Sequence, residues 1–219
     1  MNCKTLAAAM VLSLIGMTAA RAGILDLFKS SPVDTVKEGL LPEYSTTVRV
    51  GPALENYYDC VSGTASWESF ESVRGENIVE FQCVLGEEHR NDLNDPQIIA
   101  IAETGAALAG VMRSLSGEEG SEVSFKDAVA DWQELRLKVQ FALSQLDDGA
   151  FEIAYVGLSP TYSDGLVGAI PLTHGTLSGV YDNTNLFDAD LSNYASQEEG
   201  FWDLVGDVIK ARTEALQSQ

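Results

Sequence analysis

The acidic run DADLSNYASQEE, residues 188–199, is the stretch whose residue types and spacing come nearest to a ligand site. It matches a twelve-residue calcium loop, in which oxygen ligands come from positions 1, 3, 5, 7, 9 and 12. Those positions hold Asp188, Asp190, Ser192, Tyr194 (through its carbonyl), Ser196 and Glu199. Because calcium prefers several oxygen ligands, the spacing predicts a calcium site, and calcium is the one cofactor that the sequence suggests.

A second interpretation explains two of these residues without a metal. Ser196 and Glu199 have the spacing of a capping box, in which both side chains satisfy free N–H groups at the start of a helix. Asn193 also stands where the calcium loop normally has glycine. Both interpretations stay open.

Motifs for catalysis are weak. The segment GLSPT, residues 157–161, lacks the second glycine of a nucleophile elbow, and its proline would disturb the helix that should follow. The two histidines, His89 and His174, lie in no recognisable catalytic pattern. No glycine-rich loop is followed by Lys-Ser or Lys-Thr, so a phosphate-binding loop is not predicted. We predict no catalytic residues and keep an exported hydrolase as an alternative.

The charge of the chain limits its partners. There are 33 acidic and 13 basic residues, for a formal net charge of −20. Nucleic acids and anionic membranes bind through basic patches, so the sequence argues against both as partners. The charge fits a cationic partner, calcium, or solubility alone.

Residues 1–22 have the features of a secretory signal peptide. Lys4 precedes an apolar stretch, and Ala-Arg-Ala at residues 20–22 forms the expected cleavage site. The apolar stretch is shorter than the roughly 20 residues of a membrane-spanning helix, and a retained anchor is the alternative. Cleavage would remove Lys4 and Arg21 but no acid, so the net charge would change from −20 to −22. We expect a periplasmic or secreted protein whose mature chain does not span the membrane.

A β-hairpin is predicted at residues 135–158. Apolar and polar residues alternate over its first ten positions, as in a strand with one buried face. An Asp-Gly pair then favours a tight turn. The return strand places Phe151, Ile153 and Tyr155 on one face, which we expect to be the buried face that also holds Phe141.

A second hairpin is predicted at residues 67–85, where two β-patterned runs flank a turn with Gly75. Helices are expected near residues 52–59, 96–115 and 200–215, the last one amphipathic. The fold class is therefore α+β: two β-hairpins form one antiparallel sheet, and the helices pack on it.

This reading divides the chain into three parts. The signal peptide, residues 1–22, is followed by an α+β domain at residues 23–159 with a helical insertion at 86–134. Residues 160–219 form a loop-rich extension that ends in the amphipathic helix. The extension is rich in Gly, Ser, Thr, Asn and Asp up to about residue 194.

Cys60 and Cys83 are the two cysteines that remain after signal cleavage. In an exported protein an isolated pair is more often a disulfide than a metal site. Cys60 ends the helix expected near residues 52–59 and Cys83 lies in the second hairpin. We therefore predict a disulfide that joins helix to sheet.

The strings VKEGLLPEYSTTVRVGPALENYYDC and WESFESVRGENIVEFQCVL resemble a group of small bacterial exported or membrane-anchored domains of unknown role. The pattern of that group is V-K-x-G-x-L, then T-x-G-x-A-[FL]-x-x-Y/F, W-x-x-F, a turn with glycine, and V-x-F. The matching residues are Val36, Lys37, Gly39, Gly51, Ala53, Leu54, Tyr57 or Tyr58, Trp67, Phe70, Gly75, Val79 and Phe81. The resemblance covers residues 33–85 and 135–158, although Arg49-Val50 is inserted before the glycine. It implies an exported α+β domain and no particular activity.

The sequence as a whole favours an exported bacterial protein that binds another protein or a ligand and is not an enzyme. The identity of that partner does not follow from the sequence. A calcium-stabilised envelope protein and an exported hydrolase are the alternatives.

A calcium titration distinguishes the two interpretations of residues 188–199. A bound calcium ion would stabilise the fold by about 2.7 kcal/mol at a hundredfold excess over Kd. We expect instead that calcium and magnesium at equal ionic strength raise the melting temperature equally, because both screen the negative chain. A calcium-specific rise that disappears in Asp188→Asn and persists in Asp147→Asn would contradict this expectation and establish the site.

Overall fold

The computed structural model describes residues 31–88, 91, 94–104, 107, 123–144, 149–185 and 199–218. The expected signal peptide, residues 1–22, lies outside this part of the chain. Residues Pro32–Gln219 belong to one compact unit.

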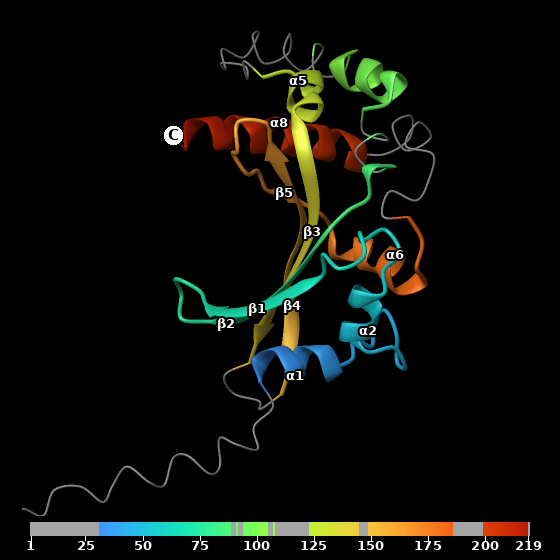
Figure 1. Cartoon of the computed structure of the whole chain (residues 1–219), viewed down its shortest axis with the longest axis vertical. Helices are drawn as coiled ribbons and strands as arrows, with labels where there is room; N and C mark the ends of the chain where they lie inside the picture. The colour runs from blue at the N-terminus through green and yellow to red at the C-terminus, as the bar shows by residue number, and fades with distance from the viewer. Residues whose placement is uncertain are drawn as a thin grey trace, which may run out of the picture. The chain divides into compact units, whose positions relative to one another are not determined.

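A five-stranded antiparallel sheet forms the centre of this unit, in the order β1-β2-β3-β4-β5 (Figure 1). Each strand therefore pairs with its neighbours in sequence. The strands are β1 (Ser66–Glu71), β2 (Asn77–Val84), β3 (Trp132–Leu143), β4 (Phe151–Tyr162) and β5 (Ile170–Pro171). Together with the helices, this sheet confirms the predicted α+β class.

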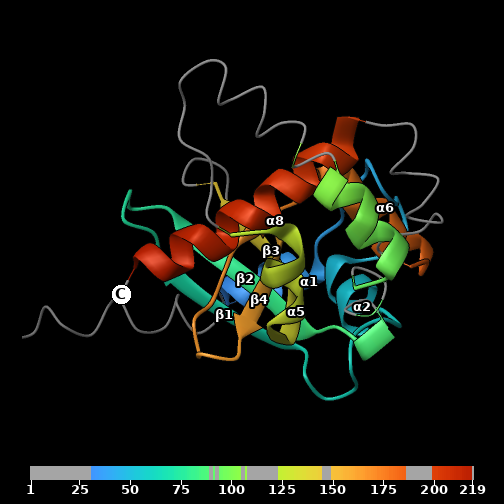
Figure 2. The same ribbon diagram turned by 90° about the horizontal axis from the view of Figure 1, so that it is seen from above.

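The helices lie at both ends of the sheet. Figure 1 shows α8 crossing β3 near one end of the strands, and α1 near the other end. Figure 2 shows α5 beside α8, in agreement with the contacts between these two helices. The helical segments are α1 (Pro32–Glu38), α2 (Val50–Glu55), α5 (Phe125–Ala130), the 3₁₀ turn η2 (His174–Thr176), α6 (Leu177–Asp182) and α8 (Glu199–Gln217).

One face of the sheet packs the hydrophobic core. Buried residues alternate along β3 as the sequence predicts, and the core-facing residues of β2 pair with them, so that Val79 lies opposite Phe141 and Phe81 lies opposite Val139. Trp67 of β1 extends this surface, with its ring centroid 5.0 Å from that of Phe81. Helices α1 and α2 supply further buried residues to the same cluster.

A β-bulge in β4 separates Tyr155 from this core. Ile153 lies opposite Phe141, but Tyr155 lies opposite Gln140, which leaves Ala154 as an extra residue. Directly paired residues point their side chains to the same face of a sheet. Ile153 therefore shares the core face with Phe141, whereas Tyr155 shares the other face with Gln140. The prediction that Tyr155 lies on the buried face is wrong, because the extra residue reverses the alternation.

Both predicted hairpins are present, and the strands of the longer one extend beyond the predicted limits. β3 begins at Trp132, and β4 continues to Tyr162. The expected boundary between residues 159 and 160 therefore falls inside β4, and the two-residue strand β5 pairs with this strand as well.

The predicted helices agree with the observed helices to different degrees. The helix expected near residues 200–215 is α8, and the one near 52–59 is α2, which already ends at Glu55. Of the helix expected at 96–115, residues 96–104 are helical, with Ile98 and Ala102 buried.

The predicted disulfide between Cys60 and Cys83 is confirmed. Cys60 does not end a helix, however, because α2 stops at Glu55 and Cys60 forms an isolated β-bridge with Leu85. The bond therefore ties the segment after α2 to β2. It fits an oxidising compartment, since disulfides are rare in reducing ones.

Reduction of this bond should lower the free energy of unfolding by about 3 kcal/mol, because it frees a loop in the unfolded chain that the bond had closed. The 23-residue separation of the two cysteines sets the size of that loop. Urea unfolding with and without reductant measures the difference. A Cys60→Ala/Cys83→Ala variant is the control and should not respond to reductant. Equal urea midpoints for the oxidised and reduced protein would contradict the prediction.

Candidate functional site

The face of the sheet opposite the core carries a buried carboxylate among polar neighbours. Glu80 of β2 is only 5% exposed. It lies opposite Gln140 of β3, whose Nε2 donates a hydrogen bond to Glu80 Oε2 at 2.6 Å. Lys138 Nζ lies 3.4 Å from the other carboxylate oxygen. A buried charge is tolerated when it is paired and hydrogen-bonded, and these two contacts provide both.

Lys138 and Gln140 form part of the floor of an open cleft of about 470 Å³, whereas Glu80 contacts both of them but does not line the cleft itself. Tyr155 and Ser159 of β4 complete the floor, and the connection between β4 and β5 and the C-terminal half of α8 form the walls. The small side chains on the walls leave this space unfilled. The wall residues are Val167, Gly168, Ala169, Ala211, Glu214, Ala215 and Ser218.

The absence of a side chain at Gly157 allows Tyr155 to lie across the floor of the cleft. A Cβ atom added at Gly157 would overlap the hydroxyl and ring of Tyr155 and would lie 2.7 Å from the carbonyl oxygen of Ile170. Glycine at this position thus allows the tyrosine to lean along β4 while β5 pairs closely beside it. The Tyr155 hydroxyl has no hydrogen-bond partner within the described part of the chain.

Burial raises the pKa of the Tyr155 phenol, and the nearby carboxylates of Glu80 and Asp207 raise it further. The phenol therefore stays protonated at neutral pH. It can both donate and accept a hydrogen bond in the cleft.

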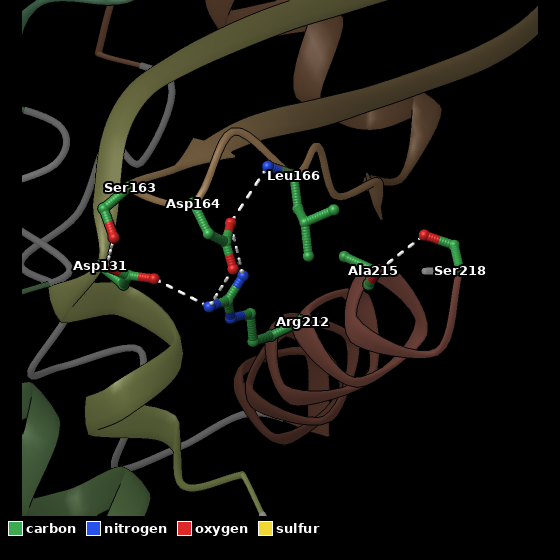
Figure 3. A network of polar contacts seen from close by, with 7 residues as sticks. All are labelled: Asp131, Ser163, Asp164, Leu166, Arg212, Ala215 and Ser218. Atoms are coloured by element: carbon green, nitrogen blue, oxygen red, sulfur yellow. Dashed lines mark hydrogen bonds and ion pairs between the residues drawn. The ribbon is translucent and has the colours of Figure 1, made fainter.

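Arg212 anchors α8 to two other segments of the chain (Figure 3). Its Nη2 lies 2.9 Å from Asp131 Oδ2, just after α5, and 2.9 Å from Asp164 Oδ2, in the turn after β4. Its guanidinium carbon also lies 4.2 Å from the centroid of the Tyr162 ring. Ser163 donates a hydrogen bond to Asp131 and so orients that carboxylate. Arginine suits such a site because its planar group binds carboxylates and stacks on aromatic rings at once.

The contact between Asp164 and Arg212 shifts the pKa values of both side chains. The hydrogen bond from Arg212 lowers the pKa of the Asp164 carboxyl, and the backbone N–H of Leu166 lowers it further. Asp164 and Asp131 in turn raise the pKa of Arg212. The arginine side chain is only 12% exposed, so solvent screens its ion pairs less than it screens pairs on an open surface.

No hydrogen bond joins Ser159 of the GLSPT segment to His174, as an exported hydrolase would require. Ser159 is buried in β4, where its hydroxyl donates to the carbonyl of Gly168 at 3.1 Å, so it stands on no strand-to-helix elbow. His174 is exposed in η2, and its backbone carbonyl accepts a hydrogen bond from the Tyr44 hydroxyl at 2.8 Å. Its imidazole has no hydrogen-bond partner in the described part of the chain.

The predicted calcium ligands cannot be placed. Asp188, Asp190, Ser192 and Tyr194 lie outside the described residues, and Glu199 begins α8 with a side chain that is also outside them. Among the residues that are described, no group of histidine, cysteine and acidic side chains has an arrangement that could hold a metal ion.

Sequence reasoning missed the polar floor of the cleft and the buried carboxylate that contacts it. Glu80 is an acid inside an otherwise apolar run, IVEFQCV, and this could have indicated a buried polar group. Lys138 and Gln140 occupy the outward positions of β3, where polar residues are ordinary and give no signal. The position of Lys138 and Gln140 in the floor of the cleft depends on the pairing register of β2, β3 and β4.

A search of protein-family models, curated proteins and solved structures finds no match to this chain. Within the described ranges, no helix combines the length and the apolar character needed to cross a membrane.

The ion pair with Arg212 should make stability depend on pH through Asp164. Because folding lowers the pKa of this carboxyl, its contribution is present above the ordinary pKa of about 4 and is lost as pH falls through the lower, folded value. Asp164→Asn should therefore be less stable than the wild type near pH 7, and the difference should shrink below about pH 4. Urea melts from pH 7 to pH 2.5 test this. Exposed Glu71→Gln is the control, and a difference for Asp164→Asn that stays constant over this range would contradict the prediction.

Proposed function

We propose that this chain is an exported, non-enzymatic binding protein whose ligand occupies the cleft between the sheet and α8. The volume of the cleft, about 470 Å³, is within the range of small-molecule sites in proteins. Such sites combine apolar walls with a few well-placed polar groups. The alanines on α8 and the polar floor have this combination.

The observation that carries the proposal is the fixed polar floor. Glu80 holds Lys138 and Gln140 by direct contacts, so both side chains are oriented before any ligand arrives. Tyr155 is oriented by its packing over Gly157. Preorganised polar groups favour binding because little conformational freedom is lost when the ligand is bound.

Binding fits this floor better than catalysis does. A general base must lie within hydrogen-bond reach of the group that it activates. Ser159 donates its hydrogen bond to a backbone carbonyl, and His174 lies outside the residues that line the cleft. The raised pKa of Tyr155 makes its hydroxyl a neutral hydrogen-bonding group rather than a nucleophile.

The disulfide supports the proposed location. A bond between Cys60 and Cys83 fits a periplasmic or secreted protein, and the signal-peptide pattern of residues 1–22 points to the same compartment.

A blocked cleft tests the proposal. Ala169 is exposed at the wall of the cleft, so Ala169→Trp should fill the space without disturbing the core. Amide NMR spectra of the oxidised protein are recorded with a panel of amines, sugars, organic acids and amino acids. We expect at least one compound to shift signals of cleft residues, and its affinity to fall about tenfold or more in Ala169→Trp, a loss of about 1.4 kcal/mol.

Thr173→Trp is the matched control, because Thr173 is also exposed but does not line the cleft. It should bind as the wild type does. The proposal fails if no panel compound shifts cleft signals, or if Ala169→Trp and Thr173→Trp bind the compound equally well.

A further inference from the structure

We infer that the free edge of β1 binds an extended, basic segment of a partner protein, which adds to the sheet as a further strand. This surface is separate from the cleft, so the inference goes beyond the proposed function and does not depend on it. It follows from the unpaired backbone of β1, from two carboxylates in this strand, and from an exposed phenylalanine between them.

The backbone of β1 is unpaired along one side. In the strand order β1-β2-β3-β4-β5, β1 is the first strand and pairs with β2 (Figure 1). Within the described part of the chain, no residue of β1 forms a backbone hydrogen bond across its other side. In an antiparallel pair only alternate residues bond to the neighbouring strand, so half of the six residues of β1 direct their N–H and C=O groups to the free edge. Such an edge is a template for an added strand.

The side chains along this edge are exposed and negative. All residues of β1 except Trp67 are exposed, and the strand contains Glu68 and Glu71 but no basic residue. Neither carboxylate forms an ion pair or a hydrogen bond with another described residue. The turn after β1 adds no net charge, because it carries both Arg74 and Glu76.

The lysines nearest to β1 are already paired. Glu68 lies opposite Glu80 of β2, and that carboxylate is the one that contacts Lys138 at 3.4 Å. On the other face of the sheet, Lys37 lies over the Trp67 ring but pairs with Glu55 at 2.6 Å. The two carboxylates of β1 are therefore left for a cation from outside this part of the chain.

The register of β1 specifies the sequence that fits beside it. Glu68 and Phe70 pair with Glu80 and Ile78, on the face of the sheet opposite the core, whereas Glu71 points to the core face. Residues directly opposite each other on neighbouring strands contact each other. Basic residues opposite Glu71 and Glu68 would pair with both carboxylates, and an apolar residue opposite Phe70 would cover its ring, which is 41% exposed. An antiparallel partner strand then reads basic–apolar–any–basic from its N-terminus.

A second copy of this chain fits the edge less well. Pairing of two β1 edges would bring four carboxylates together, Glu68 and Glu71 from each copy, and β1 supplies no cation to offset them. Like charges on neighbouring strands are destabilising, and the net charge of −20 opposes association of two copies. The same carboxylates that hinder self-association attract a basic strand.

Two capped peptides of opposite charge test the inference. In one-letter code, TRVTRVT carries the predicted pattern, and TEVTEVT replaces both arginines with glutamates. Each peptide is titrated into the oxidised protein at fixed ionic strength and followed by amide NMR. We expect TRVTRVT to shift the signals of residues 66–71 and to leave those of Ala211 and Ala215 in the cleft unchanged. TEVTEVT should bind about tenfold more weakly or not at all, because two ion pairs are replaced by two repulsions.

Backbone methylation separates strand pairing from simple charge attraction. One form of TRVTRVT is N-methylated at its even-numbered positions, and another at its odd-numbered positions. Alternate N–H groups of an added strand point to opposite sides, so only one of these two sets faces β1. We expect one methylated form to bind about tenfold more weakly, or not at all, and the other to bind as the unmodified peptide does.

Substitutions in β1 identify the groups responsible. Glu68→Gln and Glu71→Gln should each weaken binding of TRVTRVT about twofold to fivefold, as expected for one exposed ion pair. Glu152→Gln is the matched control, because Glu152 is also an exposed strand residue but lies in β4, which β2 and β3 separate from β1. It should bind as the wild type does. The double variant Glu68→Lys/Glu71→Lys should bind TEVTEVT more tightly than TRVTRVT.

Several results would overturn the inference. Equal binding of the two peptides would rule out recognition by charge, and equal binding of the two methylated forms would rule out strand addition. Absence of shifts at residues 66–71 with either peptide would rule out the site. Shifts of these residues with protein concentration alone would make a second copy the occupant and also contradict the inference. None of these results decides the proposed function, which is tested with small molecules and Ala169→Trp.

Discussion

The cleft depends on the β-bulge at Ala154. A regular strand would place Tyr155 on the same face as Ile153, in the core beside Phe141. The extra residue turns Tyr155 to the opposite face, next to Gln140, and returns Val156 to the core opposite Val139. One residue thus supplies an aromatic ring to the polar face while the core face stays continuous. Bulges commonly redirect a side chain in this way next to functional sites.

The cleft also requires α8 as a wall, and Arg212 anchors this helix. The contacts of this residue join α8 to segments 81 and 48 residues earlier in the chain, at Asp131 and Asp164. The buried Val208, Ala211 and Ala215 supply the hydrophobic part of the same docking. Because the arginine lies one residue after Ala211, the ion pairs also set the position of the alanines that line the cleft.

The sequence predicted the elements more accurately than their relative positions. The alternation in β3, the Gly75 turn and the amphipathic α8 follow from local patterns of residue type, and the disulfide follows from the number of cysteines in an exported chain. The bulge does not follow from such a pattern. Phe151, Ile153 and Tyr155 occupy alternate positions, so the sequence continues to look like a regular strand past the extra residue, Ala154. Only the change of phase to Val156 and Leu158 marks it, and these two residues are too few to establish a new alternation within the predicted strand, which ends at residue 158. The ion-pair partners of Arg212 could not be predicted from the sequence for another reason. Ion pairs between segments that lie far apart in the chain leave no periodic pattern of residue types.

The polar residues in the floor of the cleft need an explanation, because this face of the sheet could have been apolar. A buried carboxylate with paired neighbours is often no more stabilising than well-packed apolar residues of similar size, because each charge loses its hydration. Apolar residues at Lys138 and Gln140 would remove these polar groups from the floor of the cleft. The chain instead keeps a carboxylate that is 5% exposed, held by two donors, beside small residues that leave space open. Stability alone gives no reason for this arrangement, whereas the ligand that we propose, which needs oriented polar groups, does.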